Sequence, residues 1–193
     1  MLPLYMSKII GGLSKAVALL IGISAIALFA YDVIAIRPHL ARIQNVLAQA
    51  DPEDASPPQI ICNLIDTGTG SLAPLATRQV MSLVYSDLTR GQRHVHNVLW
   101  NLLLPIHFNK SQMCGLYATL SFNGTDYGLS NFARREYGKP LSQLSPIQAA
   151  TTVYILRAPA FYLGNRSMLD KHAKKLLNAS QYAPLQDQET SSK

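Results

Sequence analysis

The feature that most constrains this chain is a nearly continuous apolar run close to its N-terminus. Within residues 9–36 only Lys15 and Asp32 carry charge. The 21 residues of Ala16–Ile36 would form a helix about 31 Å long, and the hydrocarbon core of a bilayer is about 30 Å thick. A cleaved signal peptide needs an apolar core of only about 7–15 residues. The run therefore predicts an uncleaved transmembrane anchor over residues 9–36.

The rest of the chain divides by composition into three parts. Residues 37–59 begin with an amphipathic helical pattern, and their end, Asp51–Pro58, is rich in Pro, Asp and Ser, which is typical of a linker. Residues 60–182 carry several helical patterns and no alternating strand pattern of any length. Residues 183–193 are mostly polar and are expected to be a disordered tail. We therefore predict an all-α domain behind one transmembrane helix.

Helical spacing of the apolar residues locates the elements of that domain. Ser145 and Pro146 form a helix-start signal, with Ser as the N-cap and Pro at the first helical position. The expected helices lie within Ala76–Val84, Arg90–Leu104, Met113–Leu120, Pro140–Arg157 and Ser167–Leu177.

The charge balance favours anionic partners other than nucleic acid. Lys and Arg number 17 against 11 Asp and Glu, a net charge of +6. Such a surface suits anionic lipid or pyrophosphate, but no basic run with interleaved aromatic residues indicates nucleic-acid binding. His94 and His96 are two residues apart, on different faces of a helix, and the other histidines are scattered, so no metal site and no cofactor is predicted.

Cys62 and Cys114 are the only cysteines. In an oxidising compartment they could form a disulfide, and in apolar segments they could equally remain buried thiols. The sequence leaves both possibilities open.

The most specific pattern lies within Tyr127–Asn178. Its blocks are Tyr127-Gly128-Leu129, Tyr137-Gly138-Lys139, the run Leu144–Thr151, and Ala158-Pro159 with Tyr162. In order and spacing they resemble the C-terminal half of the family 51 glycosyltransferase domain. This domain is the lipid II polymerase of class A penicillin-binding proteins and of monofunctional transglycosylases.

The resemblance continues more weakly upstream. Arg93–Asn97 stands at the family's R-K-x-x-E block, Asn109–Thr119 at its S-K-x-x-I-L-E-x-Y-L-N block, and Ala76–Gln79 at the end of S-T-I-T-Q-Q. The resemblance implies a lysozyme-like domain, here shortened, at a bacterial inner membrane. The charges flanking the anchor decide its orientation only weakly. The resemblance implies the orientation instead, with a periplasmic domain and a cytoplasmic N-terminus.

The family's acidic residues are missing from two matched positions. Asn97 stands where the R-K-x-x-E block has its glutamate, and Gln148 replaces the glutamate of the later block. A side-chain amide cannot accept a proton at neutral pH, so neither residue can act as the general base that polymerisation needs. The family's first block, which supplies that base, has no convincing match, and only Glu53 and Asp66 are weak candidates for the role.

The leading hypothesis is an inactive homologue that binds lipid-linked glycan, such as lipid II or a glycan strand, or a partner in cell-wall synthesis. One alternative is an active polymerase with Asp66 or Glu53 as its base, and another is a structural subunit of a larger membrane complex. The resemblance implies that substrate contacts are retained at Thr77, Gln79, Arg90, Arg93 and Lys139.

The shortened domain also suggests an interface. Without the family's first block, the apolar segments Ile60–Ile65 and Trp100–Pro105 are expected to lack covering residues. A membrane-protein partner or self-association is therefore expected to cover them.

Overall fold

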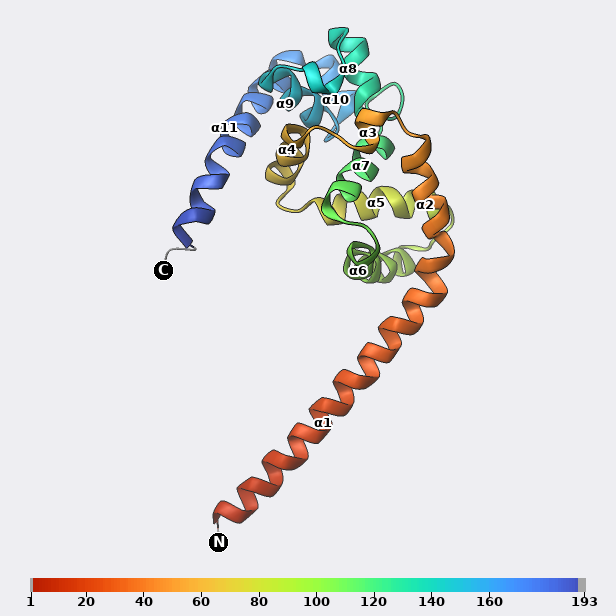
Figure 1. Ribbon diagram of the computed structural model, residues 1–193, viewed down its shortest axis with the longest axis vertical. Helices are drawn as coiled ribbons and strands as arrows, with labels where there is room; N and C mark the ends of the chain where they lie inside the picture. Colours follow the sequence, from red (N-terminus) through yellow and green to blue (C-terminus); the bar gives the residue numbers. More distant parts are fainter. Residues whose placement is uncertain (1, 191–193) are drawn as a thin grey trace. The chain divides into compact units, whose positions relative to one another are not determined.

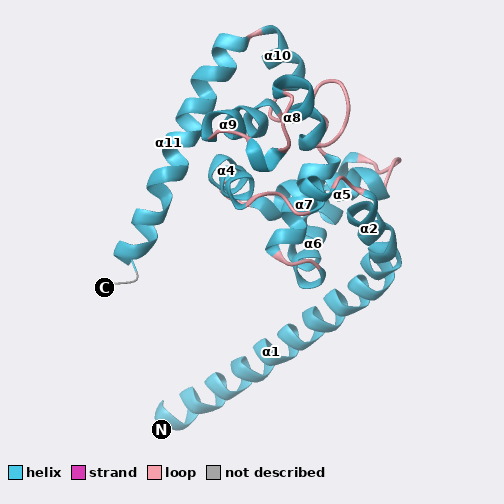
Figure 2. Cartoon of the chain, turned by 45° about the horizontal axis from the view of Figure 1, so that its top comes forward, coloured by secondary structure: helices cyan, strands magenta, loops and turns pink. Residues whose placement is uncertain are grey.

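The computed structural model describes residues 2–190, with side chains described for residues 15, 17–68 and 70–180. The regular elements in this part of the chain are helices, apart from one isolated antiparallel bridge between Phe122 and Tyr127 (Figure 2). The predicted all-α class is confirmed. The chain divides into two compact units, Met1–Ala41 and Arg42–Lys193.

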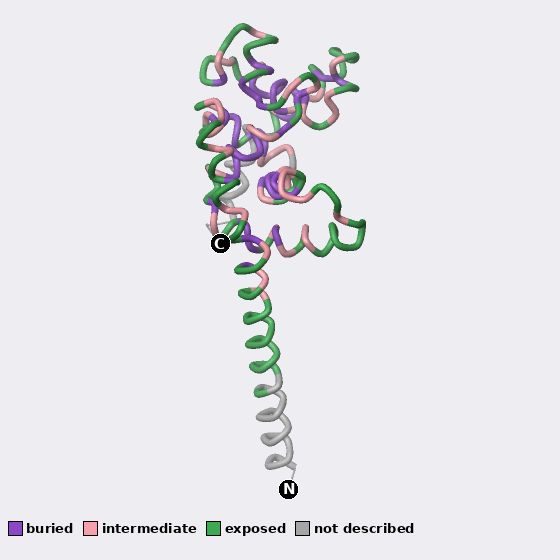
Figure 3. The backbone as a smooth tube through the Cα atoms, turned by 90° about the vertical axis from the view of Figure 1, so that its right-hand side faces the viewer, coloured by how far each residue is buried: buried purple, intermediate pink, exposed green. Residues whose placement is uncertain are grey.

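The first unit is one long helical run. It comprises α1 (Leu2–Tyr31), the π-helical turn η1 (Asp32–Ile36) and the first residues of α2 (Arg37–Gln49). The part from Val17 to Gln49 is long and apolar enough to cross a membrane, judged by length and composition. Large aliphatic side chains of α1 are exposed, and the exposed residues of this helix are green in Figure 3.

A local feature interrupts this run near the end of its apolar part. Pro38 has no N–H to donate to the carbonyl four residues earlier, and the helix widens just before it. In η1 the Arg37 N–H donates to the Asp32 carbonyl, and the Arg37 Nε donates to Asp32 Oδ2 at 2.9 Å. The wider turn thus brings Arg37 next to Asp32, five residues earlier, and the two side chains form an ion pair.

The second unit is a bundle of helices (Figure 1). It confirms the five helical segments predicted from spacing, including the start at Ser145-Pro146, where Ser145 caps the helix as expected. Its elements after α2 are α3 (Pro52–Ala55), α4 (Gln59–Thr69), α5 (Leu72–Val84), α6 (Arg90–His107), α7 (Lys110–Leu120), α8 (Leu129–Tyr137), η2 (Leu141–Gln143), α9 (Pro146–Ile155), α10 (Pro159–Gly164) and α11 (Arg166–Thr190).

Helix α7 lies at the centre of the first half of the bundle. It packs against α3, α4 and α5, and its residues Met113–Ala118 are all buried. Gly115 permits the approach of α3, because a Cβ atom there would overlap the carbonyl oxygen of Ala55. The second half is formed by α4, α9 and α11, which contact one another. An apolar cluster of Phe132, Ile155, Tyr162 and Leu169 ties α8 and α10 to these helices.

A disulfide between Cys62 and Cys114 joins α4 to α7, with 5.8 Å between their Cα atoms. This settles the alternative that the sequence left open. Disulfides persist in oxidising compartments, so the bond is consistent with a domain outside the cytoplasm.

The segment predicted as a linker is instead part of the packed unit. Asp51–Pro58 contains α3, and both Asp54 and Pro57 are buried there. Asp51 caps α3 by accepting a hydrogen bond from the Glu53 N–H at 3.0 Å, and Pro52 occupies its first position. The compact unit accordingly begins at Arg42, upstream of the boundary at residue 60 that composition predicted.

The predicted tail also differs. Helix α11 continues through residues 183–190, so these residues do not form the irregular tail that composition predicted. Residues 191–193 lie outside the described part of the chain.

The prediction of a bare apolar surface holds only in part: within the two segments Ile60 and Leu102 are exposed, but most of the other apolar side chains are buried. Trp100, Leu103 and Leu104 of α6 are buried, and so are Ile61, Leu64 and Ile65 of α4. These side chains form part of the domain's own core, which the neighbouring helices complete.

We expect the disulfide to stabilise the domain by about 4 kcal/mol, because it closes a long loop in the unfolded chain. The two cysteines are 52 residues apart in the sequence. Urea unfolding of the full chain in mild detergent should show this loss in a Cys62→Ser/Cys114→Ser double variant. Wild-type protein with a reductant should match that variant, and an unchanged unfolding midpoint in both would contradict the prediction.

Candidate functional site

A cavity of about 570 Å³ lies where α5, the end of α7 and the start of α10 meet. We call it the groove. Its lining combines hydroxyl, amide, aromatic and aliphatic groups and includes no carboxylate and no histidine. The lining residues are Gln79, Ser82, Leu83, Leu120, Ser121, Phe122, Tyr127, Leu156 and Pro159.

Two aromatic rings form one wall of the groove. Phe122 and Tyr127 face each other across the isolated β-bridge, with ring centroids 5.5 Å apart in an edge-to-face arrangement. The side chain of Tyr127 is 63% exposed. Exposed rings at the edge of a polar cavity can pack against the apolar face of a ligand while their neighbours form hydrogen bonds.

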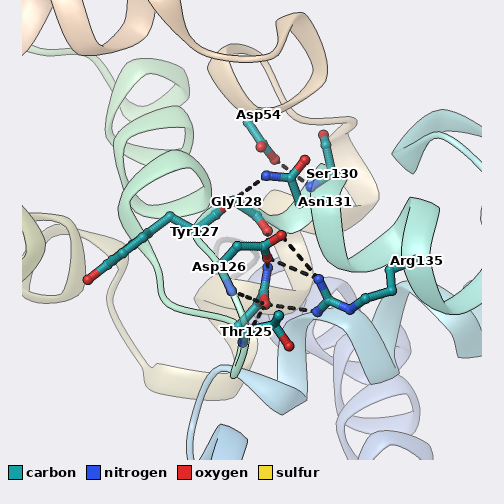
Figure 4. Close-up of polar contacts among 9 residues, drawn as sticks. Asp54, Thr125, Asp126, Tyr127, Gly128, Ser130, Asn131 and Arg135 are labelled. Carbon is teal, nitrogen blue, oxygen red and sulfur yellow. Dashed lines mark hydrogen bonds and ion pairs between the residues drawn. The ribbon is translucent and has the colours of Figure 1, made fainter.

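Asn123 holds the turn that carries this aromatic pair. Its side chain is fully buried, donates to the Gly128 carbonyl at 2.9 Å and to Asp126, and accepts from the Thr125 and Asp126 N–H groups. Arg135 of α8 closes the cluster, with hydrogen bonds to Asn123 and both oxygens of Asp126. In Figure 4 the ring of Tyr127 points away from this polar cluster. The turn is therefore fixed from within while its aromatic side chain remains exposed.

Asp54 fixes where α8 begins. Its Oδ1 accepts a hydrogen bond of 2.8 Å from the Ser130 N–H, so a side chain from α3 caps the N-terminus of α8 (Figure 4). Gly128, just before the helix, has φ +96°, and a Cβ atom there would lie 2.5 Å from Asp54 Oδ2. Both facts require glycine at this position, which gives a physical reason for the Gly in Tyr127-Gly128-Leu129.

The environment of Asp54 is unusual for a carboxyl group. Burial raises the pKa of Asp54 from 3.8 to about 6, although hydrogen bonds from Ser130 act in the opposite direction. Burial has the same effect on nearby Asp51, but there the hydrogen bonds and charge of Arg134 prevail, and the pKa of Asp51 lies below its ordinary value. Asp54 does not line the groove.

A smaller cavity of about 70 Å³ adjoins the groove, since Ser82 lines both. We call it the arginine pocket, because Arg78 of α5 and Arg93 of α6 line it together with Asn97. Among the described residues, neither guanidinium forms an ion pair with an acidic side chain. Two arginines beside a hydroxyl and an amide form a chemical setting that suits a phosphate group.

The structure separates the five residues predicted to contact substrate. Gln79 lines the groove, and Arg93 lines the arginine pocket. Arg90 is exposed at the start of α6, and Lys139 is exposed just after α8, but neither lines one of these two cavities. Thr77 is fully buried, and its hydroxyl has no hydrogen-bond partner in the described part of the chain.

The two carboxylates considered as catalytic bases have structural partners away from the groove. Glu53 accepts hydrogen bonds from the backbone and hydroxyl of Ser142 and from the Leu141 N–H, at the start of η2. Asp66 pairs with Lys110 and accepts from the Leu72 N–H at 3.2 Å. Asn97 lies in the arginine pocket.

Gln148 also has a structural role. It forms a capping box with Ser145 at the start of α9, in which its side chain accepts from the Ser145 N–H at 2.9 Å. A glutamate can fill this role equally well. The capping box therefore does not distinguish between Gln and Glu at this position.

Sequence reasoning missed several of the lining residues. Phe122 and Tyr127 had a usable signal, because they flank Asn123-Gly124-Thr125-Asp126, a turn-forming stretch between two aromatic residues. For Arg78 and Ser82 the sequence offered no signal of a site beyond their helical spacing. Asp51-Pro52 could have indicated the helix that carries Asp54.

No protein-family model matches this chain, and no curated protein is similar to it at a significant level. Among the described residues, no three His, Cys, Asp or Glu side chains lie close enough together to hold a metal ion.

The raised pKa of Asp54 predicts how pH affects stability. The folded state binds this proton more tightly than the unfolded state does. The Asp54 carboxyl therefore stabilises the fold as the pH falls through about 6, and this stabilisation is lost as the pH rises through the same value. From pH 7 to pH 4, wild type should gain about 2–3 kcal/mol of unfolding free energy relative to an Asp54→Asn variant.

Urea titrations of both proteins at each pH measure this difference. Asp170→Asn, which alters an exposed carboxyl of α11, serves as the control and should follow wild type. A constant difference between wild type and Asp54→Asn across this range would contradict the prediction.

Proposed function

We propose that this chain is a single-pass membrane protein whose helical domain binds a lipid-linked glycan without polymerising it. In this proposal the apolar helix anchors the protein in a bacterial inner membrane, with its N-terminus in the cytoplasm and its domain in the periplasm. The length of the apolar run and the disulfide support this placement. The domain would be a shortened, non-catalytic relative of the family 51 glycosyltransferases.

One observation carries the proposal: separate segments that resemble the family meet at one place. Gln79 comes from the upstream block on α5, Tyr127 from the Tyr-Gly-Leu block, and Pro159 from the Ala-Pro block, and all three line the groove. Arg93 and Asn97 of a fourth block line the adjoining arginine pocket. Convergence of this kind is expected if the blocks once formed, or still form, a common binding site.

The chemistry of the two cavities suits the parts of a lipid-linked glycan. The Phe122–Tyr127 pair offers rings against which the apolar face of a sugar can pack, and Gln79 and Ser82 offer hydrogen-bonding groups. The arginines next to them can form charge-assisted hydrogen bonds with a phosphate. A sugar in the groove and its phosphate in the arginine pocket would be neighbours, as they are in such a ligand.

Binding is favoured over catalysis because the groove lacks a group that could accept a proton. Polymerisation needs a general base within hydrogen-bond reach of the attacking hydroxyl. The groove lining holds no carboxylate and no histidine, while Glu53 and Asp66 are held by partners elsewhere.

Affinity for the ligand should depend on Gln79 and Tyr127 of the groove and not on Lys139, which lines neither cavity. A Gln79→Ala/Tyr127→Ala double variant should lose about 2–3 kcal/mol of binding free energy, since it removes a hydrogen bond and an aromatic contact. Binding of fluorescent lipid II to the full chain in detergent measures this loss. Lys139→Ala is the matched control, because it removes an exposed cation outside both cavities. Equal affinities for all three proteins would contradict the proposed site.

Glycan polymerisation should be absent. Wild-type protein incubated with labelled lipid II should yield no polymer on gel electrophoresis, with an active family 51 enzyme as the positive control. Processive chains that disappear in Asp66→Asn or Glu53→Gln would instead establish the alternative, a polymerase that uses one of these carboxylates as its base.

A further inference from the structure

Helix α6 carries a second apolar surface that the domain does not cover. Val95, Val98, Leu102 and Ile106 are 56%, 57%, 56% and 72% exposed. Their spacing of three, four and four residues places them along one side of the helix. We call these four residues the α6 stripe.

The stripe is distinct from the face of α6 that builds the core. Trp100, Leu103 and Leu104 supply that buried face, so the domain can fold without covering the stripe. A row of exposed aliphatic side chains along several turns of helix marks an interaction surface.

The charges on α6 indicate the kind of surface that it would meet. The helix contains no Asp or Glu, and Arg90 and Arg93 are exposed at its N-terminal end. A helix with an exposed aliphatic stripe, and with cations but no acid among its other exposed residues, has the pattern of a helix that lies in the interface of an anionic bilayer.

The composition of the stripe argues for lipid over a protein partner. Protein interfaces depend on central aromatic or arginine anchors, but the exposed stripe is entirely aliphatic, and the only tryptophan of the chain is buried in the core. The apolar N-terminal run, if it spans the bilayer, also keeps the domain within reach of a lipid surface at high effective concentration.

We propose that the α6 stripe docks on the surface of the bilayer that holds the anchor. The inference rests on the anchoring part of the proposed function and is independent of glycan binding. Docking would also place the arginine pocket close to the bilayer, since Arg93 and Asn97 of that pocket belong to α6. Docking of α6 would hold that pocket near the headgroups, where the phosphate of a lipid-linked glycan lies.

The test measures the depth of a spin label on the stripe. Both native cysteines are in the disulfide, so a Leu102→Cys variant of the full chain can be labelled selectively without reductant. Ser167→Cys, at an exposed position of α11, is the matched control. Each protein is reconstituted into vesicles of phosphatidylglycerol with phosphatidylcholine, or of phosphatidylcholine alone, and its flotation with the vesicles is checked first.

The label on residue 102 should lie about 5–10 Å below the headgroups in anionic vesicles. It should be several-fold less accessible to a water-soluble nickel reagent than the label on residue 167, and this protection should weaken in phosphatidylcholine. A Val98→Glu/Ile106→Glu change in the same labelled protein should abolish the protection, with its circular dichroism spectrum and unfolding midpoint checking that the fold is intact.

Three outcomes would overturn docking. A label on residue 102 that stays in water while the protein floats would refute docking alone and leave the anchor intact. Protection that depends on protein concentration, with dipolar coupling between labels on two copies, would assign the stripe to self-association. Failure to float would remove the anchor and docking together. None of these three results bears on lipid II binding in detergent.

Discussion

The close approach of α3 to α7 is the contact on which the geometry of the candidate site depends. It is possible because Gly115 has no side chain where the carbonyl oxygen of Ala55 lies. The approach holds Asp54, the residue before Ala55, against the N-terminus of α8, where it accepts from the Ser130 N–H. A substitution at Gly115 would therefore act on the groove from a distance, because it would displace the group that fixes the start of α8.

The consequences continue from α8 into the groove. Gly128 adopts a positive φ just before the helix, and Tyr127 precedes it on the aromatic wall. Asn123 and Arg135 then tie the turn back to α8. The backbone that carries Tyr127 is thus held by two polar clusters, one from α3 and one within the turn. Such preorganisation is what a binding site needs, since less conformational freedom is lost when the ligand arrives.

Periodicity predicted the helices because most of them bury one face, and the Ser145-Pro146 start was readable because a cap is a local interaction. It could not predict what depends on distant residues. Asp54 lies in a segment rich in Pro, Asp and Ser, and only the packing of α3 turns it into a buried cap. The disulfide needs a distance between α4 and α7 that two apolar segments do not specify. Helix α6 is apolar on two sides, and spacing alone cannot say that Trp100 is buried while Leu102 is exposed.

The distribution of charge connects these observations with binding. In the second unit, several carboxylates have structural partners: Asp51 pairs with Arg134, Asp66 with Lys110, Asp126 with Arg135 and Glu136 with Arg166. Asp54 and Glu53 cap helices. None of these acids faces Arg78 or Arg93 in the arginine pocket. Two arginines that line one pocket, with no paired acid among the described residues, favour the binding of an anion there. The acidic side chains named above cap helices or form ion pairs, and none of them lines the groove. Such a groove is better suited to hold an anionic ligand than to remove a proton from it.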